Sequence, residues 1–390
     1  MSDLYTYFYE LSYNLLKDNG TSVFITSNKW NRAKYGKLLR SFFKSKVYLT
    51  EIINFGDLKI FENAITNTNI TIFEKEKSLN EEILYCELNK EINNLKIYDY
   101  INNNHISYSK NKLELDNFTF LDKESDLLKN KIYAKCIPLK EKKYQMYAGV
   151  HTGFNEAFVI NENIKKQLIK KDANSKKLIK KIIRGRDIFK YNFVDPKKWI
   201  IFTKRGINIS SFPAIEEHLK KYKKYLQPKK SKKDKFGRKP GPYKWYEIQD
   251  NTAYYDKFKD KKIIWIELTN ENRFCICEDE YFLLAGSWML LGQDLDYLLG
   301  YLNSKVSLFM FSLISNSSGM STTQWKKFAL EKLPIPKNFN STKKKEIEKL
   351  VKRMKICKKK SDYDDLILKI NKIFYDFFEL DKKEINIIEN

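Results

Sequence analysis

Patterns typical of helices and patterns typical of strands alternate along the first 75 residues, and no other feature of the sequence restricts the fold as strongly. Helices are expected at 3–19 and about 33–45, a fully buried strand at 21–27, and two further strands at 48–55 and 67–75. Strands that alternate with helices favour an α/β sheet. The last two strands are joined by a loop, so we expect an antiparallel pair at the end of that sheet.

The first helix carries its apolar residues Leu4, Phe8, Leu11 and Leu15 at helical spacing, which places them on one face. A nucleotide-binding α/β domain normally opens with a strand and a glycine-rich turn, whereas this sequence opens on a helix. We therefore expect an incomplete domain. If no partner chain completes the sheet, these four side chains should be left partly uncovered, as an exposed apolar patch.

The sequence is strongly basic, with 73 Lys and Arg residues against 49 Asp and Glu and a net charge of +24. A positive field of that size favours polyanions or anionic membrane surfaces as partners. An aromatic content of 15% excludes a disordered chain. Residues 220–244, here called the basic loop, contain twelve Lys or Arg residues and one acid, together with glycines and prolines. We expect a mobile loop that contacts phosphate.

Several classes of protein and site are excluded. The sequence has no apolar run of about 18 residues, the length of a membrane-spanning helix, and no basic signal-peptide region at its start. We therefore expect a cytoplasmic protein without membrane contact. The five cysteines are scattered, and the close pair Cys275 and Cys277 lacks further ligands for a zinc site, so buried thiols and no metal are expected.

No catalytic motif is found. Phosphate-binding turns need clustered glycines so that backbone N–H groups can reach the anion, but the thirteen glycines never occur as G-x-G or in a Walker motif. The three histidines, His105, His151 and His218, have no serine or cysteine nucleophile in a recognisable context. No catalytic, cofactor-binding or metal-binding residue is therefore predicted in this chain.

A second organisation begins near residue 131, where short β-rich runs are broken by helical pieces. Residues 78–130 before it are weakly periodic and suit an irregular crossing between domains, and residues 337–390 are helical. In YAGVHTGFNEAFVI, residues 147–160, two glycines flank His151. This stretch suits either a tight turn between two strands or a turn whose backbone and polar side chains face a ligand.

The ordered series of these segments resembles a known family. Residues 3–40 (DLYTYFYELSYNLLKDNGTSVFITSNKWNRAKYGKLLR) and 52–75 (IINFGDLKIFENAITNTNITIFEK) resemble the last third of the catalytic domain of TaqI-like adenine-specific DNA methyltransferases, including type IIG restriction–modification enzymes. YAGVHTGFNEAFVI and LIKKIIRGRDIFKY resemble the opening of the TaqI-like specificity domain, and KWIIFTK, LLGYLNSK and FALEKLPIPK resemble its remainder.

The resemblance implies a fold class and a division of the chain. The fold is expected to be α/β, with the C-terminal part of a Rossmann-like methyltransferase sheet followed by a mixed α+β target-recognition domain and C-terminal helices. The corresponding segments are 1–77 for the incomplete catalytic domain, 78–130 for the crossing, 131–336 for the specificity domain, and 337–390 for the helical end. The implied partner is double-stranded DNA.

Two motifs of that family are absent from this sequence. The family binds S-adenosyl-L-methionine (AdoMet) with a glycine-rich motif and holds the target adenine with an Asn-Pro-Pro-Tyr/Phe motif, but none of the eight prolines here forms Asn-Pro-Pro. Methyl transfer needs the donor positioned in line with the target nitrogen. The chain alone is therefore expected neither to bind AdoMet nor to transfer methyl groups. An N-terminal methyltransferase chain, or upstream gene product, is expected to supply both motifs.

Site residues follow from the resemblance. Phe61 matches the family's aromatic residue that stacks on the extruded base; the alternative is a phenylalanine packed into the sheet. Lys29, Arg32 and Lys34 follow the strand 21–27 at its carboxyl end and are expected to contact phosphate, whereas Trp30 is equally well explained by packing.

The specificity domain supplies the remaining candidates. Arg184 and Arg186 are expected to contact DNA, although an internal ion pair with Asp187 explains the motif equally well. The full set of expected DNA contacts in this domain is His151, Thr152, Asn155, Arg184, Arg186, Lys229, Lys230, Lys232, Lys233, Arg238 and Lys239.

The expected function is DNA recognition and target-base handling for site-specific methylation of the adenine amino group in a type II restriction–modification system. A DNA-binding specificity module, or an inactive remnant without methyltransferase chemistry, is the alternative. An RNA-binding protein is a third possibility, favoured only by the charge and the aromatic content.

Overall fold

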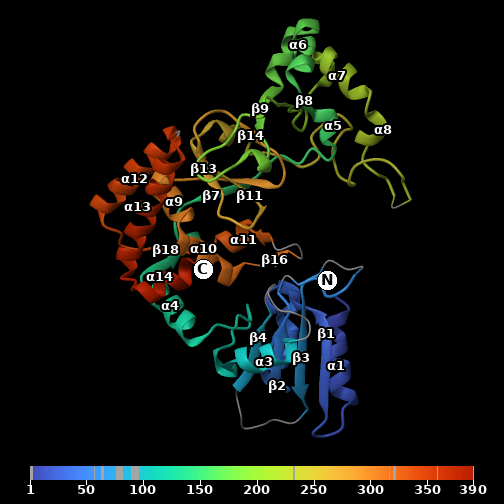
Figure 1. Cartoon of the computed structure of the whole chain (residues 1–390). Coiled ribbons are helices and arrows are strands. Elements are labelled where there is room, and N and C mark those ends of the chain that lie inside the picture. Colours follow the sequence, from blue (N-terminus) through green and yellow to red (C-terminus); the bar gives the residue numbers. More distant parts are fainter. Residues whose placement is uncertain are drawn as a thin grey trace. The chain divides into compact units, whose positions relative to one another are not determined.

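The computed structural model describes residues 3–56, 58–62, 66–75, 82–88, 96–231, 233–315, 317–318, 322–357 and 359–389. The chain forms two compact units, each assembled from separate segments (Figure 1). The first unit comprises Met1–Pro138, Lys305–Lys337 and Tyr375–Asn390, and the second comprises Leu139–Ser304 and Asn338–Phe374.

A five-stranded mixed sheet is the centre of the first unit, in the order β1-β3-β2-β4-β5. Its strands are β1 (Thr21–Ser27), β2 (Tyr48–Asn54), β3 (Thr68–Glu74), β4 (Glu82–Glu87) and β5 (Ile106–Ser109). β3 is antiparallel to both β1 and β2, as the loop between the last two predicted strands suggested. β4 pairs with β2 in parallel and with β5 in antiparallel orientation.

The strand β1 lies at the edge of this sheet. We expected it to be fully buried, but the structure leaves one of its faces exposed. Helix α1 (Tyr5–Leu15) covers one face of it, where the hydroxyl groups of Tyr9 and Thr26 lie 2.7 Å apart. On the opposite face, Val23 is 62% exposed and Ile25 is 43% exposed. The apolar run in the sequence suggested burial on both sides, but only one side has a covering helix.

The core of the first unit is aromatic. Tyr9, Trp30, Phe43 and Phe73 are fully buried and pack around the sheet face that carries α1 and α2. Other helices of this unit lie later in the chain. The helices other than α1 are α2 (Lys37–Ser45), α3 (Ile97–Asn104), α4 (Lys123–Ala134), α10 (Lys305–Ile314), α11 (Lys327–Leu330) and α14 (Lys382–Glu389).

The segment 78–130 is not only an irregular crossing, because it contributes β4, α3 and β5 to the first unit. Its many polar residues obscured short strands in which Ile83 and Tyr108 are buried. The unit also contains two small strand pairs. β6 (Cys136–Pro138) pairs with β18 (Pro334–Pro336), and β16 (Ser317–Ser318) pairs with β17 (Thr322–Gln324).

The second unit contains two four-stranded sheets, ordered β14-β9-β10-β8 and β13-β11-β15-β7. Ile182, Ile200 and Phe282 from the first of these, and Ile264 and Met289 from the second, belong to one buried core. The strands of this unit are β7 (Gln145–Ala148), β8 (Val159–Ile160), β9 (Ile179–Ile183), β10 (Trp199–Ile201), β11 (Lys262–Ile266), β12 (Leu268–Thr269), β13 (Phe274–Cys277), β14 (Phe282–Leu283) and β15 (Ser287–Leu291).

Helices of the second unit include the two longest among the described residues, α12 (Ser341–Ile356) and α13 (Lys360–Phe378). With α14 they confirm that the chain is helical after residue 341. The shorter helices are α5 (Asn155–Phe158), α6 (Glu162–Lys171), α7 (Pro213–Lys220), α8 (Lys223–Leu226) and α9 (Leu295–Leu302). Within the described part of the chain no single helix has the length and composition of a membrane span, although α9 and α10 reach that composition as a bent pair.

All five cysteines are free thiols. Cys86, Cys136, Cys275 and Cys277 are buried and Cys357 is half-buried, which agrees with the expectation of buried thiols for four of the five. Burial raises the pKa of the Cys136 thiol to about 12.

Candidate nucleic-acid interface

Two exposed lysines, Lys29 and Lys34, lie in the turns that follow β1 at its carboxyl end. Arg32 lies between them but is half-buried. Its Nη1 donates to the carbonyl oxygens of Ser312 at 2.9 Å and Ser315 at 3.0 Å, at the C-terminal end of α10. Arg32 thus binds two segments of the first unit together, and we assign it to packing rather than to DNA contact. Trp30 likewise packs, since it is fully buried.

A chain of polar side chains crosses the carboxyl ends of β1, β2 and β4. Asn28 Nδ2 donates to Asn54 Oδ1 at 2.9 Å, Asn54 Nδ2 donates to the Tyr85 hydroxyl at 3.2 Å, and that hydroxyl donates to a Glu87 carboxylate oxygen at 2.7 Å. Burial raises the pKa of Tyr85 well above its ordinary value. The chain fixes the orientation of Asn28 at the sheet edge where ligands bind in open α/β folds.

This chain of side chains was not predicted from the sequence, because two of its members come from β4, inside the segment expected to be irregular. A signal for the other two was present, since Asn28 and Asn54 each stand at the end of a predicted strand.

Phe61 lies in the segment between β2 and β3 with 41% of its surface exposed, and its neighbour Ile60 is 37% exposed. The side chain is therefore not packed into the sheet, which was the alternative to base stacking. An exposed aromatic ring is free to stack on another planar group, so its role against an extruded base stays a prediction.

Two glycines of the first unit, Gly20 and Gly36, are not placed to hold AdoMet. Glycines near the sheet would have to leave their backbone N–H groups open to the cofactor. Here a Cβ added to Gly20 would lie 2.8 Å from the Lys17 carbonyl oxygen, and one added to Gly36 would lie 2.2 Å from that of Trp30. These glycines pack against the chain itself and form no cradle.

The glycine-framed stretch 147–160 is a turn that joins β7 to α5. Gly149 permits close approach to the Leu284 backbone, and Gly153 has a φ of +77°, a conformation that favours glycine. Thr152 is buried, and its hydroxyl donates to Asn155 Oδ1 at 2.6 Å. Thr152 therefore positions Asn155 and has no free surface for DNA. His151 and Asn155 are exposed.

The motif formed by Arg184, Arg186 and Asp187 contains an internal ion pair. Arg184 donates from Nε and Nη2 to the two carboxylate oxygens of Asp187, both at 2.8 Å, and its backbone N–H donates to the same carboxylate at 2.9 Å. The hydrogen bond to Asp187 raises the pKa of Arg184. Arg184 thus makes the turn rigid, whereas Arg186 is exposed.

The basic loop is anchored by Arg238, which is 3% exposed. The guanidinium group donates to the carbonyl oxygens of Leu226 and Thr152 at 2.7 Å, of Glu247 at 2.9 Å and of Trp245 at 3.0 Å. Burial lowers the pKa of Arg238 to about 10, which leaves the group charged at neutral pH. Arg238 holds the loop to its neighbours and is not available to DNA, contrary to the expectation.

The loop is more ordered than its composition suggested. The Lys229 N–H donates to the Arg238 carbonyl oxygen at 2.9 Å, and the Asp234 carboxylate accepts from the backbone of Lys230 at 2.7 Å and of Ser231 at 3.1 Å. The exposed lysines of the loop among the expected contacts are Lys230, Lys233 and Lys239, and Lys229 is half-buried. Lys232, also expected to contact DNA, lies outside the described residues.

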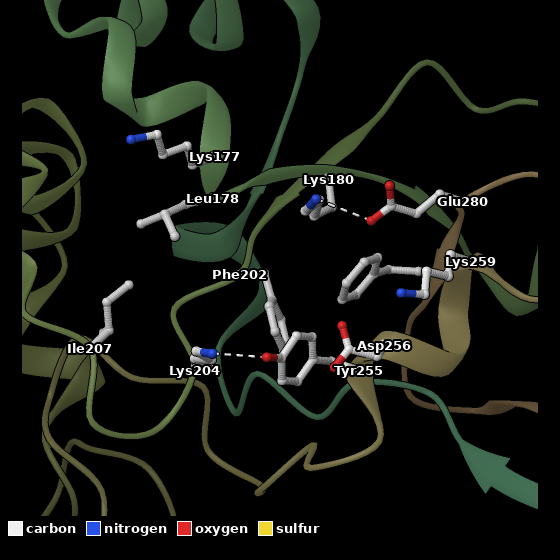
Figure 2. A pocket seen from close by; sticks show the side chains of 11 residues that line it. Lys177, Leu178, Lys180, Phe202, Lys204, Ile207, Tyr255, Asp256, Lys259 and Glu280 are labelled. Atoms are coloured by element: carbon white, nitrogen blue, oxygen red, sulfur yellow. Dashed lines mark hydrogen bonds and ion pairs between the residues drawn. The ribbon is translucent and has the colours of Figure 1, made fainter.

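A pocket of about 220 Å³ opens beside β9 and β10 (Figure 2). Lys180 pairs with Glu280 at 3.0 Å, and Lys204 donates to the Tyr255 hydroxyl at 2.9 Å. The lining of the pocket combines aromatic rings and lysines with two carboxylates, Asp256 and Glu280. Its lining residues are Lys177, Leu178, Lys180, Phe202, Lys204, Ile207, Tyr255, Asp256, Lys259, Glu280 and Phe282.

Comparison with known proteins gives two family matches. Residues 1–61 match the Eco57I restriction-modification methylase, and residues 180–335 match the TaqI-like C-terminal specificity domain. The two matches fall in the two parts of the chain that differ in sequence pattern, and residues 62–179 lie between them.

Individual relatives agree. The chain is 25% identical over 316 residues to the type II restriction enzyme and methyltransferase RM.Eco57I of Escherichia coli, covering 73% of this chain and 30% of the relative. It is 21% identical to the type II methyltransferase M.BstVI of Geobacillus stearothermophilus, covering 100% of this chain and 69% of the relative. The type IIL restriction-modification enzyme MmeI, solved in complex with DNA, shares the fold with a TM-score of 0.66 at 14% identity, covering 98% of this chain and 51% of MmeI.

Together, these matches relate the first 61 residues to a restriction–modification methylase and residues 180–335 to a specificity domain. By these matches the chain is similar to the C-terminal portion of TaqI-like restriction–modification methyltransferases. It spans 30% of RM.Eco57I and about half of MmeI.

Proposed function

We propose that this chain recognises duplex DNA and handles the target base for methylation of the adenine amino group in a type II restriction–modification system in the cytoplasm. The observation that carries the proposal is the match of residues 180–335 to a TaqI-like specificity domain, together with the ordered basic loop inside that range. In this proposal residues 131–336 read DNA and residues 1–77 form the end of the catalytic domain.

The candidate DNA contacts of the second unit divide into two roles. Lys229, Lys230, Lys233 and Lys239, with Lys232, bind backbone phosphates, which set the register on the duplex without reading sequence. His151, Asn155 and Arg186 are the exposed hydrogen-bonding groups on the rigid turns next to them, and they contact base edges in the major groove. Thr152, Arg184 and Arg238 keep these turns in place.

In the first unit, Phe61 stacks on the adenine once it has left the helix. Lys29 and Lys34 contact phosphates beside it. AdoMet, when bound in the complete enzyme, supplies the methyl group. No step through AdoMet is assigned to this chain, since Gly20 and Gly36 pack against the chain itself.

The remainder of the catalytic domain comes from a partner chain, which packs on the edge formed by α1 and β1. Leu4 is 67% exposed, Phe8 46%, Leu11 50% and Leu15 76%. On the sheet face opposite to α1, Val23 and Ile25 of β1 are exposed as well. Exposed apolar side chains at an unpaired strand edge are typical of an interface. The partner would bring the AdoMet-binding and Asn-Pro-Pro motifs.

The absence of both motifs from the sequence favours a second candidate, a DNA-binding specificity module without methyltransferase chemistry. A methyl-transfer assay separates the two candidates. The purified chain is incubated with labelled AdoMet and duplex DNA, alone and with the product of the neighbouring upstream reading frame. Label in DNA only in the mixture supports the split enzyme. Silence in both, with salt-sensitive duplex binding, supports the module, and silence without duplex binding contradicts the proposal.

A further inference from the structure

The basic loop presents an aromatic side chain at its surface. Phe236 is 39% exposed although it is large and apolar, and Tyr225 next to it is 41% exposed. The two rings meet edge to face with centroids 5.5 Å apart, and Tyr225 in turn stacks on Phe154 at 5.3 Å with the planes 5° apart. The three rings are thus in contact in a row, with Tyr225 between Phe154 and Phe236. Part of the Phe236 ring stays exposed.

Lysines surround this ring. Lys224 Nζ lies over Phe236, 3.8 Å from the ring centroid, and Lys235 Nζ lies 5.8 Å from it. An ammonium group over one face stabilises the ring electrostatically and draws phosphates towards it. A protein partner with a neutral apolar surface would meet these charges unfavourably, whereas a nucleic acid offers phosphates and flat bases together.

The base of the loop is rigid. Gly237, directly after Phe236, has a φ of +112°, and the next residue is the buried Arg238 with its carbonyl partners. The Arg238 N–H also donates to the Gln227 carbonyl oxygen at 2.9 Å. A side chain fixed in this way pays little conformational entropy when it binds.

We propose that Phe236 is a wedge that enters between adjacent base pairs of duplex DNA and bends it, while the lysines of the basic loop hold the flanking phosphates. The inference rests on the proposed recognition of duplex DNA and adds a mechanism to it. Apolar side chains that unstack one base step kink the duplex and let it contact more protein surface. Sequences with easily unstacked pyrimidine–purine steps at that position are then favoured without any hydrogen bond to their bases.

The test is ligase-mediated circularisation of linear DNA fragments of roughly 120 bp, which is shorter than the persistence length of about 150 bp. Such fragments close rarely unless a protein bends them, and the assay needs no known recognition sequence. The wild-type chain is expected to raise the circularisation rate on the order of tenfold, Phe236→Ala is expected to lose that increase, and Phe236→Leu, which keeps an apolar wedge, is expected to retain it. Phe328→Ala is the control, because it removes another exposed phenylalanine, on α11, that has no proposed role in DNA binding.

Duplex binding is measured in parallel by fluorescence anisotropy. If the wild type binds duplex DNA without raising circularisation, or if Phe236→Ala bends DNA as well as the wild type, the wedge is refuted while DNA recognition stands. Tighter binding to a single-stranded oligonucleotide than to duplex, with Phe236→Ala weakening only the former, refutes the wedge in favour of stacking on unpaired bases. Failure to bind duplex DNA at all overturns the wedge and the proposed function together. Unchanged thermal unfolding of Phe236→Ala confirms that the variant is folded.

Discussion

Arg238 donates a hydrogen bond from Nη1 to the carbonyl oxygen of Thr152 at 2.7 Å, across 86 residues of sequence. The bond ties the basic loop to the turn that carries His151 and Asn155. The lysines proposed to hold phosphates and two of the residues proposed to read bases, His151 and Asn155, are therefore positioned by one buried guanidinium group.

Replacing Arg238 with Met is expected to destabilise the second unit by about 3 kcal/mol, because buried carbonyl oxygens lose their donors. Chemical denaturation followed by tryptophan fluorescence measures the loss. Lys239→Met, at the exposed neighbouring position, is the control and should change stability by less than about 0.5 kcal/mol. Equal stabilities for the two variants would contradict the anchoring role.

Replacing Lys229, Lys230, Lys233 and Lys239 with Gln is expected to flatten the dependence of DNA affinity on salt. Each neutralised phosphate contributes about −0.9 to the slope of log K against log salt, so the slope should become shallower by roughly 3 to 4. Anisotropy titrations across a salt series give the slope. Four exposed lysines of α12, among them Lys345 and Lys349, provide a variant of the same charge; an equal effect there would mean that only net charge matters.

In a reconstituted enzyme, Phe61→Ala is expected to lower the methylation rate about five- to a hundredfold while DNA affinity is retained. Base stacking contributes about 1–3 kcal/mol per base, which sets this range. Ile60→Ala, at the neighbouring exposed position, is the matched control. Unchanged turnover in Phe61→Ala would refute base stacking by this residue.

Leu11→Glu combined with Leu15→Glu is expected to abolish association with the partner chain without unfolding the first unit, because both side chains are exposed on α1. Stability should change by less than about 0.5 kcal/mol per site. Leu127→Glu on α4, where the leucine is 62% exposed, serves as the control. Analytical ultracentrifugation of the mixed chains distinguishes the outcomes, and retained association would place the interface elsewhere.

The buried thiol of Cys136 is expected to make the folded protein less stable at alkaline pH. Burial raises its folded-state pKa to about 12, above the ordinary value of about 8.5 expected in the unfolded chain. Between these values the unfolded thiol releases its proton and the folded one keeps it, so the free energy of unfolding falls as pH rises. Cys136→Ala should show a weaker decline than the wild type in denaturation curves at pH 8 and pH 10. Parallel declines would remove Cys136 as a cause.

The sequence predicted the elements of the first 75 residues because their patterns are local. Side-chain alternation revealed β3, and the apolar spacing of α1 revealed the face that is now seen to be exposed. The sequence did not predict that one face of β1 is exposed, since Val23 and Ile25 give the same pattern in a buried strand and in an uncovered edge strand. Likewise β4 and β5 were hidden because short strands among polar residues carry little periodicity.

The sequence predicted which types of residue make up the site, but not which of its arginines are used in packing. In the sequence, Arg238 is surrounded by lysines. No local sequence pattern distinguishes an arginine that donates to buried carbonyl groups from an arginine that binds phosphate. Arg32 and Arg184 are similar cases, since their partners Ser315 and Asp187 are set by the fold. For Arg184 the spacing to Asp187 did allow the ion pair to be considered, and the structure selects that alternative.

Each unit is built from separated stretches of chain, and this governs how specificity can change during evolution. Residues 139–304 and 338–374 complete one unit, while 305–337 belongs to the other. A recombination event that exchanges only one continuous block would separate α9 from α12, which pack together. New target preferences should therefore arise more readily by substitution on the turns around Arg238 than by transfer of a whole domain between genes.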